Sequence, residues 1–238
     1  MNYYHAQLTY DSSLAFPYIQ VHASFQMPGG DMAKRFGNNM SVGGALVYKF
    51  KNNFLITTDG NYFFGKNVKE NVLSQLEVSY SGGTFVVDNE GYPADLRVNE
   101  RGWNLTLNVG KIFYVGGKNK NRGIHYQIGG GYFQHKINLF DAQQRIAAIK
   151  SAWKKGYDKL NMGVCLYQYL GYTYLSSNRY VNFTIGLEMY YAITKNVRYY
   201  DYATASIDNK QYHNFLYGIK FGWILPVYRK IDGIFFYD

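Results

Sequence analysis

The segment 180–191, YVNFTIGLEMYY, strictly alternates between two kinds of residue. Its odd positions are apolar, and its even positions are polar, small or tyrosine, with a carboxylate at Glu188. A period of two places successive side chains on opposite faces of an extended strand. In a soluble sheet the polar face meets water. In a closed membrane barrel the apolar face meets lipid and Glu188 points into the lumen. The rest of the chain decides between these two arrangements.

The same alternation recurs along the chain and predicts eight strands of about 10 to 15 residues, the length a tilted strand needs to cross a bilayer. The predicted strands are 17–27, 40–50, 54–65, 102–115, 124–137, 159–173, 180–191 and 212–227. Each carries its apolar residues on one face, and the opposite face is too polar for a dry core. A soluble lipocalin-like barrel would need the reverse, an apolar inside and a polar outside.

The connections between these strands alternate long and short from the first to the last. Outer-membrane barrels combine an even strand number with short periplasmic turns and long external loops, whereas a soluble sandwich has no reason to sort its loops. We therefore predict an all-β fold, an eight-stranded antiparallel up-and-down transmembrane β-barrel with long external loops, located in the bacterial outer membrane.

Composition agrees with a membrane surface made of strands. The chain holds 26 Tyr and 16 Phe among 238 residues, a level typical of surfaces that are half apolar and half wet, such as barrel girdles. No apolar run approaches the roughly 18 residues of a spanning helix. The first residues also lack the basic and apolar regions of a signal peptide. Either a leader has been removed or the protein is not exported, and an outer-membrane location requires the former.

The formal net charge of +9 raises nucleic acid as a partner, but the chain has no long Lys/Arg cluster and no nucleic-acid motif. We expect no nucleic acid. The scattered basic residues favour anionic lipid headgroups, including lipopolysaccharide, or an acidic protein. The single cysteine, Cys165, excludes an intramolecular disulfide.

The expected organisation has a periplasmic lead (1–16), a barrel (17–227) and a periplasmic tail (228–238). Within the barrel, 66–101 is expected as a long external loop, with a helix-like start and a small hairpin turning at Asp88–Gly91. The segment 138–158 is expected as a loop with a short amphipathic helix. Exposed aromatic residues in this loop and in the tail are candidate contacts for partner proteins. These residues are Trp153, Phe235, Phe236 and Tyr237.

The inward faces predict a polar network in the lumen, because an eight-stranded barrel is filled by its own side chains. Glu188 and Lys220 fall on neighbouring predicted strands and are expected to pair, since a buried charge needs a partner. His22, on the strand that closes the barrel, is expected to join them. The predicted network comprises Glu188, Lys220, His22, Asp59, Lys49 and His125.

The same residues offer little for catalysis or metal binding. Ser24 and His22 share the inward face of the first strand, where a lipid substrate cannot easily reach them. The five histidines are too scattered for metal-ligand spacing. We expect no catalytic residues, no metal and no cofactor. The alternative of a proton-transfer or binding site at Glu188, His22 and Asp59 stays open.

Several blocks resemble small outer-membrane β-barrel proteins of the Bacteroidota, over most of the chain from about residue 37 onward. The blocks are NVKENVL, ERGW, GKIFYVGGKNKNRGIHYQIGGGYFQHKI, KGYDKL, GYTYLSSNRYVNFTIGLE and LYGIKFGWILPVY. In that phylum, barrels of this size include accessory subunits of type IX secretion and of the linked gliding machinery. The resemblance therefore implies a non-enzymatic structural or accessory subunit of an envelope complex. The alternatives are a narrow channel or small-ligand-binding barrel, and then a lipid-modifying enzyme.

Overall fold

The fold comes from a computed structural model of the chain. It describes residues 13, 15–74, 76–80, 83–94, 96–116, 120–141, 143, 145–146, 149, 153–175, 182–198 and 200–227. The predicted lead falls almost entirely outside these residues, and the tail does so completely.

Eight antiparallel strands form a closed barrel in the order β1-β10-β9-β8-β7-β6-β3-β2, which confirms the predicted fold class. The ring closes where the first strand pairs with the last, for example Val21 with Trp223. The strands are β1 (Phe16–Gly30), β2 (Asn39–Lys49), β3 (Phe54–Gly65), β6 (Leu96–Tyr114), β7 (Gly123–Asp141), β8 (Asn161–Leu175), β9 (Asn182–Asn196) and β10 (Gln211–Pro226). A short hairpin, β4 (Glu77–Tyr80) with β5 (Gly83–Val86), stands outside the ring.

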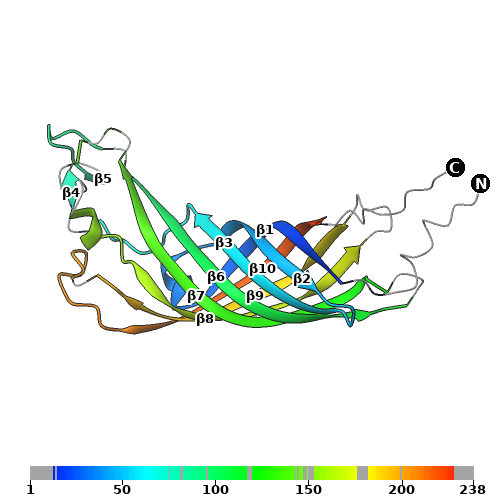
Figure 1. Cartoon of the computed structure of the whole chain (residues 1–238). Coiled ribbons are helices and arrows are strands. Elements are labelled where there is room, and N and C mark those ends of the chain that lie inside the picture. The colour runs from blue at the N-terminus through cyan, green and yellow to red at the C-terminus, as the bar shows by residue number, and fades with distance from the viewer. Residues whose placement is uncertain are drawn as a thin grey trace, which may run out of the picture.

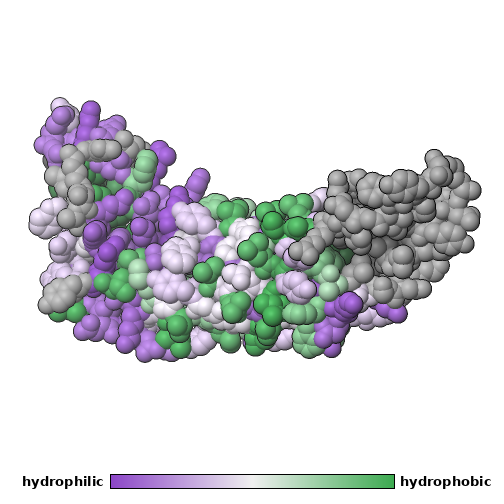
Figure 2. All heavy atoms as spheres, viewed as in Figure 1, coloured by the Kyte–Doolittle hydropathy of each residue, from purple (hydrophilic) through white to green (hydrophobic). Residues whose placement is uncertain are grey.

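The period-two pattern sorts the two faces of every barrel strand. In β9, Leu187 is 62% exposed on the outer face, while its neighbour Glu188 is 3% exposed in the lumen. Leu187 pairs with Ile219 on β10 and with Leu170 on β8, and all three are exposed. Figure 2 shows hydrophobic residues gathered over the middle of the barrel and hydrophilic residues over one end.

An apolar outside around a charged inside is the arrangement of a membrane-spanning barrel. In water, a barrel with this arrangement would be destabilised at both faces, because it would expose its apolar side chains and bury its charges. No helix among the described residues is long and apolar enough to cross a membrane.

The two ends of the barrel differ. The chain passes from β2 to β3, from β6 to β7 and from β8 to β9 at the end of the barrel where β1 begins and β10 ends, which we name the terminal end (Figure 1). The other four connections lie at the opposite end, the loop end. There β6 and β7, with 19 residues each, run beyond the ring towards β4 and β5.

Several element bounds differ from the sequence expectation at the loop end. β6 begins at Leu96 and β7 continues to Asp141, so both expected loops start or finish as strand. These extensions lie on long strands that pair with each other outside the ring, where the lipid-driven alternation is no longer required. β1 extends to Gly30, so its connection to β2 is only residues 31–38, and this connection contains a five-residue helix, α1 (Asp31–Arg35).

The helix-like start expected for 66–101 is not found, and the short helix expected within 138–158 lies largely outside the described residues. Val72 is buried, but its segment is a turn, and residues 153–156 form a single 3-10 turn, η2 (Trp153–Gly156). The predicted turn at Asp88–Gly91 is present. The Asp88 N–H donates to the Tyr92 carbonyl (2.8 Å), and Gly91 has a positive φ of 84°.

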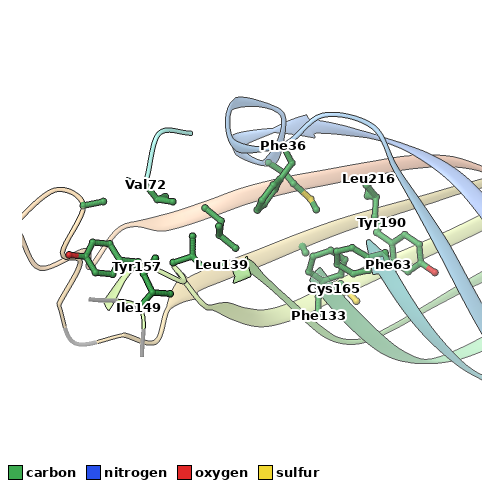
Figure 3. Close-up of a cluster of buried hydrophobic side chains, with 14 of the residues drawn as sticks. Phe36, Phe63, Val72, Phe133, Leu139, Ile149, Tyr157, Cys165, Tyr190 and Leu216 are labelled. Carbon is green, nitrogen blue, oxygen red and sulfur yellow. The ribbon is translucent and has the colours of Figure 1, made fainter. Parts of the chain in front are cut away.

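The lumen is less polar than expected. A buried hydrophobic cluster runs from inside the barrel out under the loops, and Figure 3 shows its side chains from Tyr190 and Phe63 to Val72 and Tyr157. A smaller cluster, which includes Tyr18 and Ile112, lies elsewhere in the barrel. Inward tyrosines count as polar in the sequence alternation, but their rings supply a dry core at the loop side.

Candidate functional site

The centre of the lumen is crossed by a buried ion pair. Lys220 on β10 donates from Nζ to Asp59 Oδ2 on β3 at 2.8 Å. Two strands, β1 and β2, separate β10 from β3 in the ring, so this bond spans the interior rather than running along the sheet. Both side chains are almost completely buried. A buried cation holds its charge only with such a partner, so the pair ties opposite walls of the barrel together.

Glu188 is the second carboxylate near Lys220. Its Oε2 lies 3.7 Å from Lys220 Nζ, while its Oε1 accepts a hydrogen bond from Gln26 Nε2 on β1 at 2.7 Å. The expected pairing of Glu188 with Lys220 is therefore present, but the shorter bond of Lys220 goes to Asp59. One cation thus faces two carboxylates in this part of the lumen.

His22 lies beside the pair, as predicted. Its Nε2 is 2.7 Å from Asn61 Oδ1 and 3.6 Å from Asp59 Oδ1. The Asn61 amide nitrogen donates in turn to Asp59 and to the Tyr190 hydroxyl. Gly43 on β2 makes room for this contact, since a Cβ there would lie 2.6 Å from His22 Nε2.

The two remaining predicted residues are buried in the lumen but form separate contacts. His125 Nδ1 lies 3.0 Å from Thr173 Oγ1, and its ring packs edge-on against Tyr169. Lys49 sits near the terminal end, where Nζ donates to Asn121 Oδ1 at 2.9 Å and to Ser13 Oγ at 3.0 Å. The predicted six-residue network is therefore a four-residue group, Lys220, Asp59, Glu188 and His22, with Lys49 and His125 apart from it.

An aromatic layer lies in the lumen on the loop side of this group. Phe63 stacks on Phe133 with 5.2 Å between ring centroids, and Tyr167 packs against Tyr190 at 4.7 Å. All four rings are buried. Figure 3 shows Phe63, Phe133 and Tyr190 together inside the barrel. Lys220 Nζ also donates to the Tyr167 hydroxyl (3.3 Å), which joins the charged group to the layer.

Little space remains in the polar part of the lumen. A cavity lined by Asp59, Lys220, His125 and Tyr18, among others, leaves about 10 Å³ for water. A single water needs at least 10 to 15 Å³ by this measure, so the cavity holds about one. Such a space is too small for a ligand and does not form an aqueous channel.

Four ion-paired residues close the loop end, one from each of its connections. Arg35 in α1 contacts Glu70 (Nε–Oε2 2.6 Å), and Lys159 contacts both Glu70 (2.5 Å) and Asp201 (2.9 Å). Arg35, Lys159 and Asp201 are buried, and Glu70 is partly exposed. We name these four residues the loop clasp. Lys159 takes an uncommon φ of 41°, a strained conformation for a residue with a side chain.

A second ion pair adjoins the loop clasp. Arg198 binds Asp158 through Nε (2.7 Å) and Nη2 (2.5 Å). In such a bidentate contact, two parallel hydrogen bonds strengthen the attraction between the opposite charges. These hydrogen bonds raise the pKa of Arg198. The Asp158 carbonyl also accepts from the Ile137 N–H on β7, which fixes this loop to the barrel rim.

The expected partner contacts are described only in part. Trp153 is 61% exposed at the loop end, and its ring lies 6.0 Å from that of Tyr202. Phe235, Phe236 and Tyr237 lie outside the described residues. Within the described part of the chain, no group of three or more His, Cys, Asp or Glu side chains is arranged to hold a metal ion.

Sequence reasoning missed the loop clasp and the aromatic layer. The clasp residues lie in connections without periodicity, so no sequence pattern marks them as partners. The layer had a usable signal, since Phe133 and Tyr167 fell on predicted inward faces. Their spacing around the ring depends on the stagger of the strands, which the sequence does not specify.

No known protein-family model and no curated protein matches the chain. Among solved structures, Neisserial surface protein A is similar to it with a TM-score of 0.48 and 10% identity, covering 89% of this chain and 97% of that one. The attachment invasion locus protein Ail of Yersinia pestis has a TM-score of 0.40 and 10% identity, covering 88% of this chain and 99% of that one. The outer membrane protein OprG of Pseudomonas aeruginosa has a TM-score of 0.36 and 15% identity, covering 91% of this chain and 98% of that one. With TM-scores below 0.5, none of them adds to the membrane assignment. That assignment rests on the charged lumen and on the exposed apolar side chains of the strands' outer faces, which we name the apolar belt.

Proposed function

We propose that this outer-membrane barrel is a closed, non-enzymatic structural or accessory subunit of a larger envelope complex. The observation that carries the proposal is the filled lumen: an ion pair joins β3 to β10 across the interior, and an aromatic layer covers it on the loop side. A barrel closed in this way offers its outer surface and its ends, but not its interior, to other molecules.

Two features argue against the alternative of a narrow channel or ligand-binding lumen. The polar cavity beside Lys220 has room for about one water, and the loop clasp joins all four connections of the loop end. Conduction would require both the ion pairs of the clasp and the packed aromatic rings to separate.

The geometry also argues against a lipid-modifying enzyme built on Ser24 and His22. Both side chains are buried in the lumen, and His22 Nε2 is engaged by Asn61. A nucleophile must be within hydrogen-bond reach of its base and of the substrate, and a lipid in the bilayer cannot approach this face.

The loop end is the surface we assign to partner proteins. Large apolar side chains are exposed there beyond the belt, and a contiguous patch of such groups would mark an interaction site. These side chains include Tyr92, Phe140, Trp153, Val197 and Ile207. The tail residues Phe235, Phe236 and Tyr237 are a second proposed contact, at the other side of the membrane.

The choice of complex follows from the resemblance to Bacteroidota barrels. We propose the type IX secretion and gliding machinery as the first complex to test. The support for this choice is the set of sequence blocks quoted above, and neither the fold nor the structural similarities distinguishes it from another envelope assembly.

The test is the size of the native assembly. Membranes from cells that make the protein at its natural level are extracted with mild detergent and resolved on a native gel. We expect wild-type protein in a band much larger than the barrel. The double substitution Trp153→Ala, Tyr92→Ala, or removal of 228–238, is expected to shift protein to the free barrel without loss of folding. The matched control is Tyr114→Ala, which replaces an exposed aromatic residue at the last position of β6. Migration of the wild type as a free barrel would contradict the scaffold role.

A further inference from the structure

A pocket of about 370 Å³ lies on the outer face of the barrel, over β3, β6 and β7. Two cationic side chains, two aromatic rings and two amides line it. The lining side chains are Arg101, Lys136, Tyr62, Trp103, Gln134 and Asn138. No acidic residue is part of this lining.

The two cations face each other without a counter-charge. Arg101 and Lys136 are direct partners in the β6–β7 ladder, so their side chains leave the same face side by side. Like charges in this position destabilise a sheet. Among the described residues, no carboxylate lies within ion-pair distance of either. The one hydrogen bond described for Arg101 goes to the neighbouring Glu100 carbonyl, at 3.3 Å.

The neighbouring side chains shape the pocket for an anion. Arg101 stands over the Phe64 ring at 5.8 Å, which holds the guanidinium against the strand surface. The Gln134 amide oxygen accepts from the Tyr132 hydroxyl at 3.3 Å. The Gln134 amide nitrogen is then the end that can donate to a bound oxygen.

The pocket lies at the border of the apolar belt. From Arg101 towards the terminal end, the outward residues of β6 are Trp103, Leu105 and Leu107, all exposed. The order is therefore charge, then an aromatic ring, then aliphatic side chains, which matches a lipid's headgroup, interface and acyl chains. In Figure 2, hydrophilic residues of the loop end meet the hydrophobic middle of the barrel along such a border.

We propose that Arg101 and Lys136 bind the phosphate of an anionic membrane lipid, whose acyl chains lie along Trp103 and Leu105. Guanidinium and ammonium groups are the usual partners of phosphate oxygens. The phosphate would supply the missing counter-charge of the ladder pair. This site rests on the membrane placement in the proposed function, but it does not require the scaffold role.

The test uses the full chain in detergent micelles, with lipopolysaccharide or phosphatidylcholine titrated in and bound lipid counted by native mass spectrometry. The double substitution Arg101→Gln, Lys136→Gln removes both charges. Each basic residue near an anionic surface contributes about 1 kcal/mol, so affinity for lipopolysaccharide should fall roughly thirtyfold. Phosphatidylcholine binding should stay weak and unchanged.

The matched control is Lys195→Gln, Lys210→Gln, which removes the same charge from exposed positions at the loop end of β9 and β10. It should leave the affinity near the wild-type value. Equal loss in both variants would overturn the site, because general charge attraction would then explain binding. Displacement of the lipid by an equal concentration of inorganic phosphate would also overturn it. Neither result would alter the native-gel test of the scaffold role, so the two proposals fail separately.

Discussion

Lys220 on β10 and Asp59 on β3 join opposite walls of the barrel through a 2.8 Å bond from Nζ to Oδ2. Asp59 has a second neighbour in His22, and Lys220 has a second carboxylate in Glu188. The lumen is thus held by one cation shared between two carboxylates from different strands. Because Lys220 contacts both carboxylates, the loss of Lys220 and the loss of Asp59 should have unequal effects on the stability of the barrel.

Loss of the cation should cost more than loss of one carboxylate. Lys220→Met leaves Asp59 and Glu188 buried without a counter-ion, so we expect a loss of about 3–5 kcal/mol in the free energy of unfolding. Asp59→Asn leaves Lys220 with Glu188 and should cost clearly less. Urea unfolding in lipid vesicles measures both, with Lys195→Met as the exposed control. Equal costs would contradict the shared-cation arrangement.

The aromatic layer leaves no room for a side chain at Gly102, so we expect this position not to tolerate substitution. A Cβ at this position would lie 2.1 Å from the Phe63 ring and 2.6 Å from the Gln134 carbonyl oxygen. Gly102→Ala should destabilise the barrel by about 1–3 kcal/mol, because the Phe63 ring that it would displace is fully buried and stacked on Phe133. Gly60→Ala is the control, since its nearest neighbour, Leu105 Cδ1, is 3.7 Å away. The same unfolding assay checks both, and a neutral Gly102→Ala would refute the packing.

The loop clasp should govern the loop end and not the barrel. Lys159→Gln removes the charge that joins Glu70 to Asp201, so amides of the loop segments should exchange hydrogen faster while those of the strands stay protected. Lys34→Gln is the control, because its ion pair with Asp31 is exposed and contributes about 0–1 kcal/mol. Hydrogen exchange followed by mass spectrometry measures the effect. Unchanged loop exchange in Lys159→Gln would show that the clasp does not hold the loops.

The belt and the lumen make opposite predictions for adjacent residues of β9. Leu187→Arg near the middle of the strand should cost about 2–4 kcal/mol in a bilayer, because it places a charge in lipid. Glu188→Leu should also destabilise, but by leaving Lys220 with one carboxylate and Gln26 without its acceptor. Only the Leu187→Arg penalty should shrink in short-chain detergent, where water reaches the outer face. A Leu187→Arg penalty that is the same in the bilayer and in detergent would contradict the lipid-facing assignment of Leu187.

The sequence was sufficient to predict the faces of the strands and most of their bounds. A period of two assigns each residue to lumen or lipid, so it places Leu187 outside and Glu188, His22 and Lys220 inside. The bounds of β3 agree with the prediction to the residue. The pattern is reliable here because lipid and a packed lumen both penalise a misplaced side chain.

The partners inside the lumen could not be predicted to the same degree. Neighbouring strands follow from chain order, which is why Glu188 was expected beside Lys220. Contacts across the lumen depend on strand stagger, and this brings Asp59 closer than Glu188. The loop clasp lies beyond any periodic signal, because loop residues are positioned by the fold rather than by a repeating pattern.

The most direct test of the closed barrel is its conductance in a planar lipid bilayer under concentrated KCl. The filled lumen predicts no current steps from the wild-type protein, even though insertion is verified by protection of the strands from protease. Reproducible steps of the size of a water-filled pore, from protein with an intact Lys220–Asp59 pair, would contradict the account.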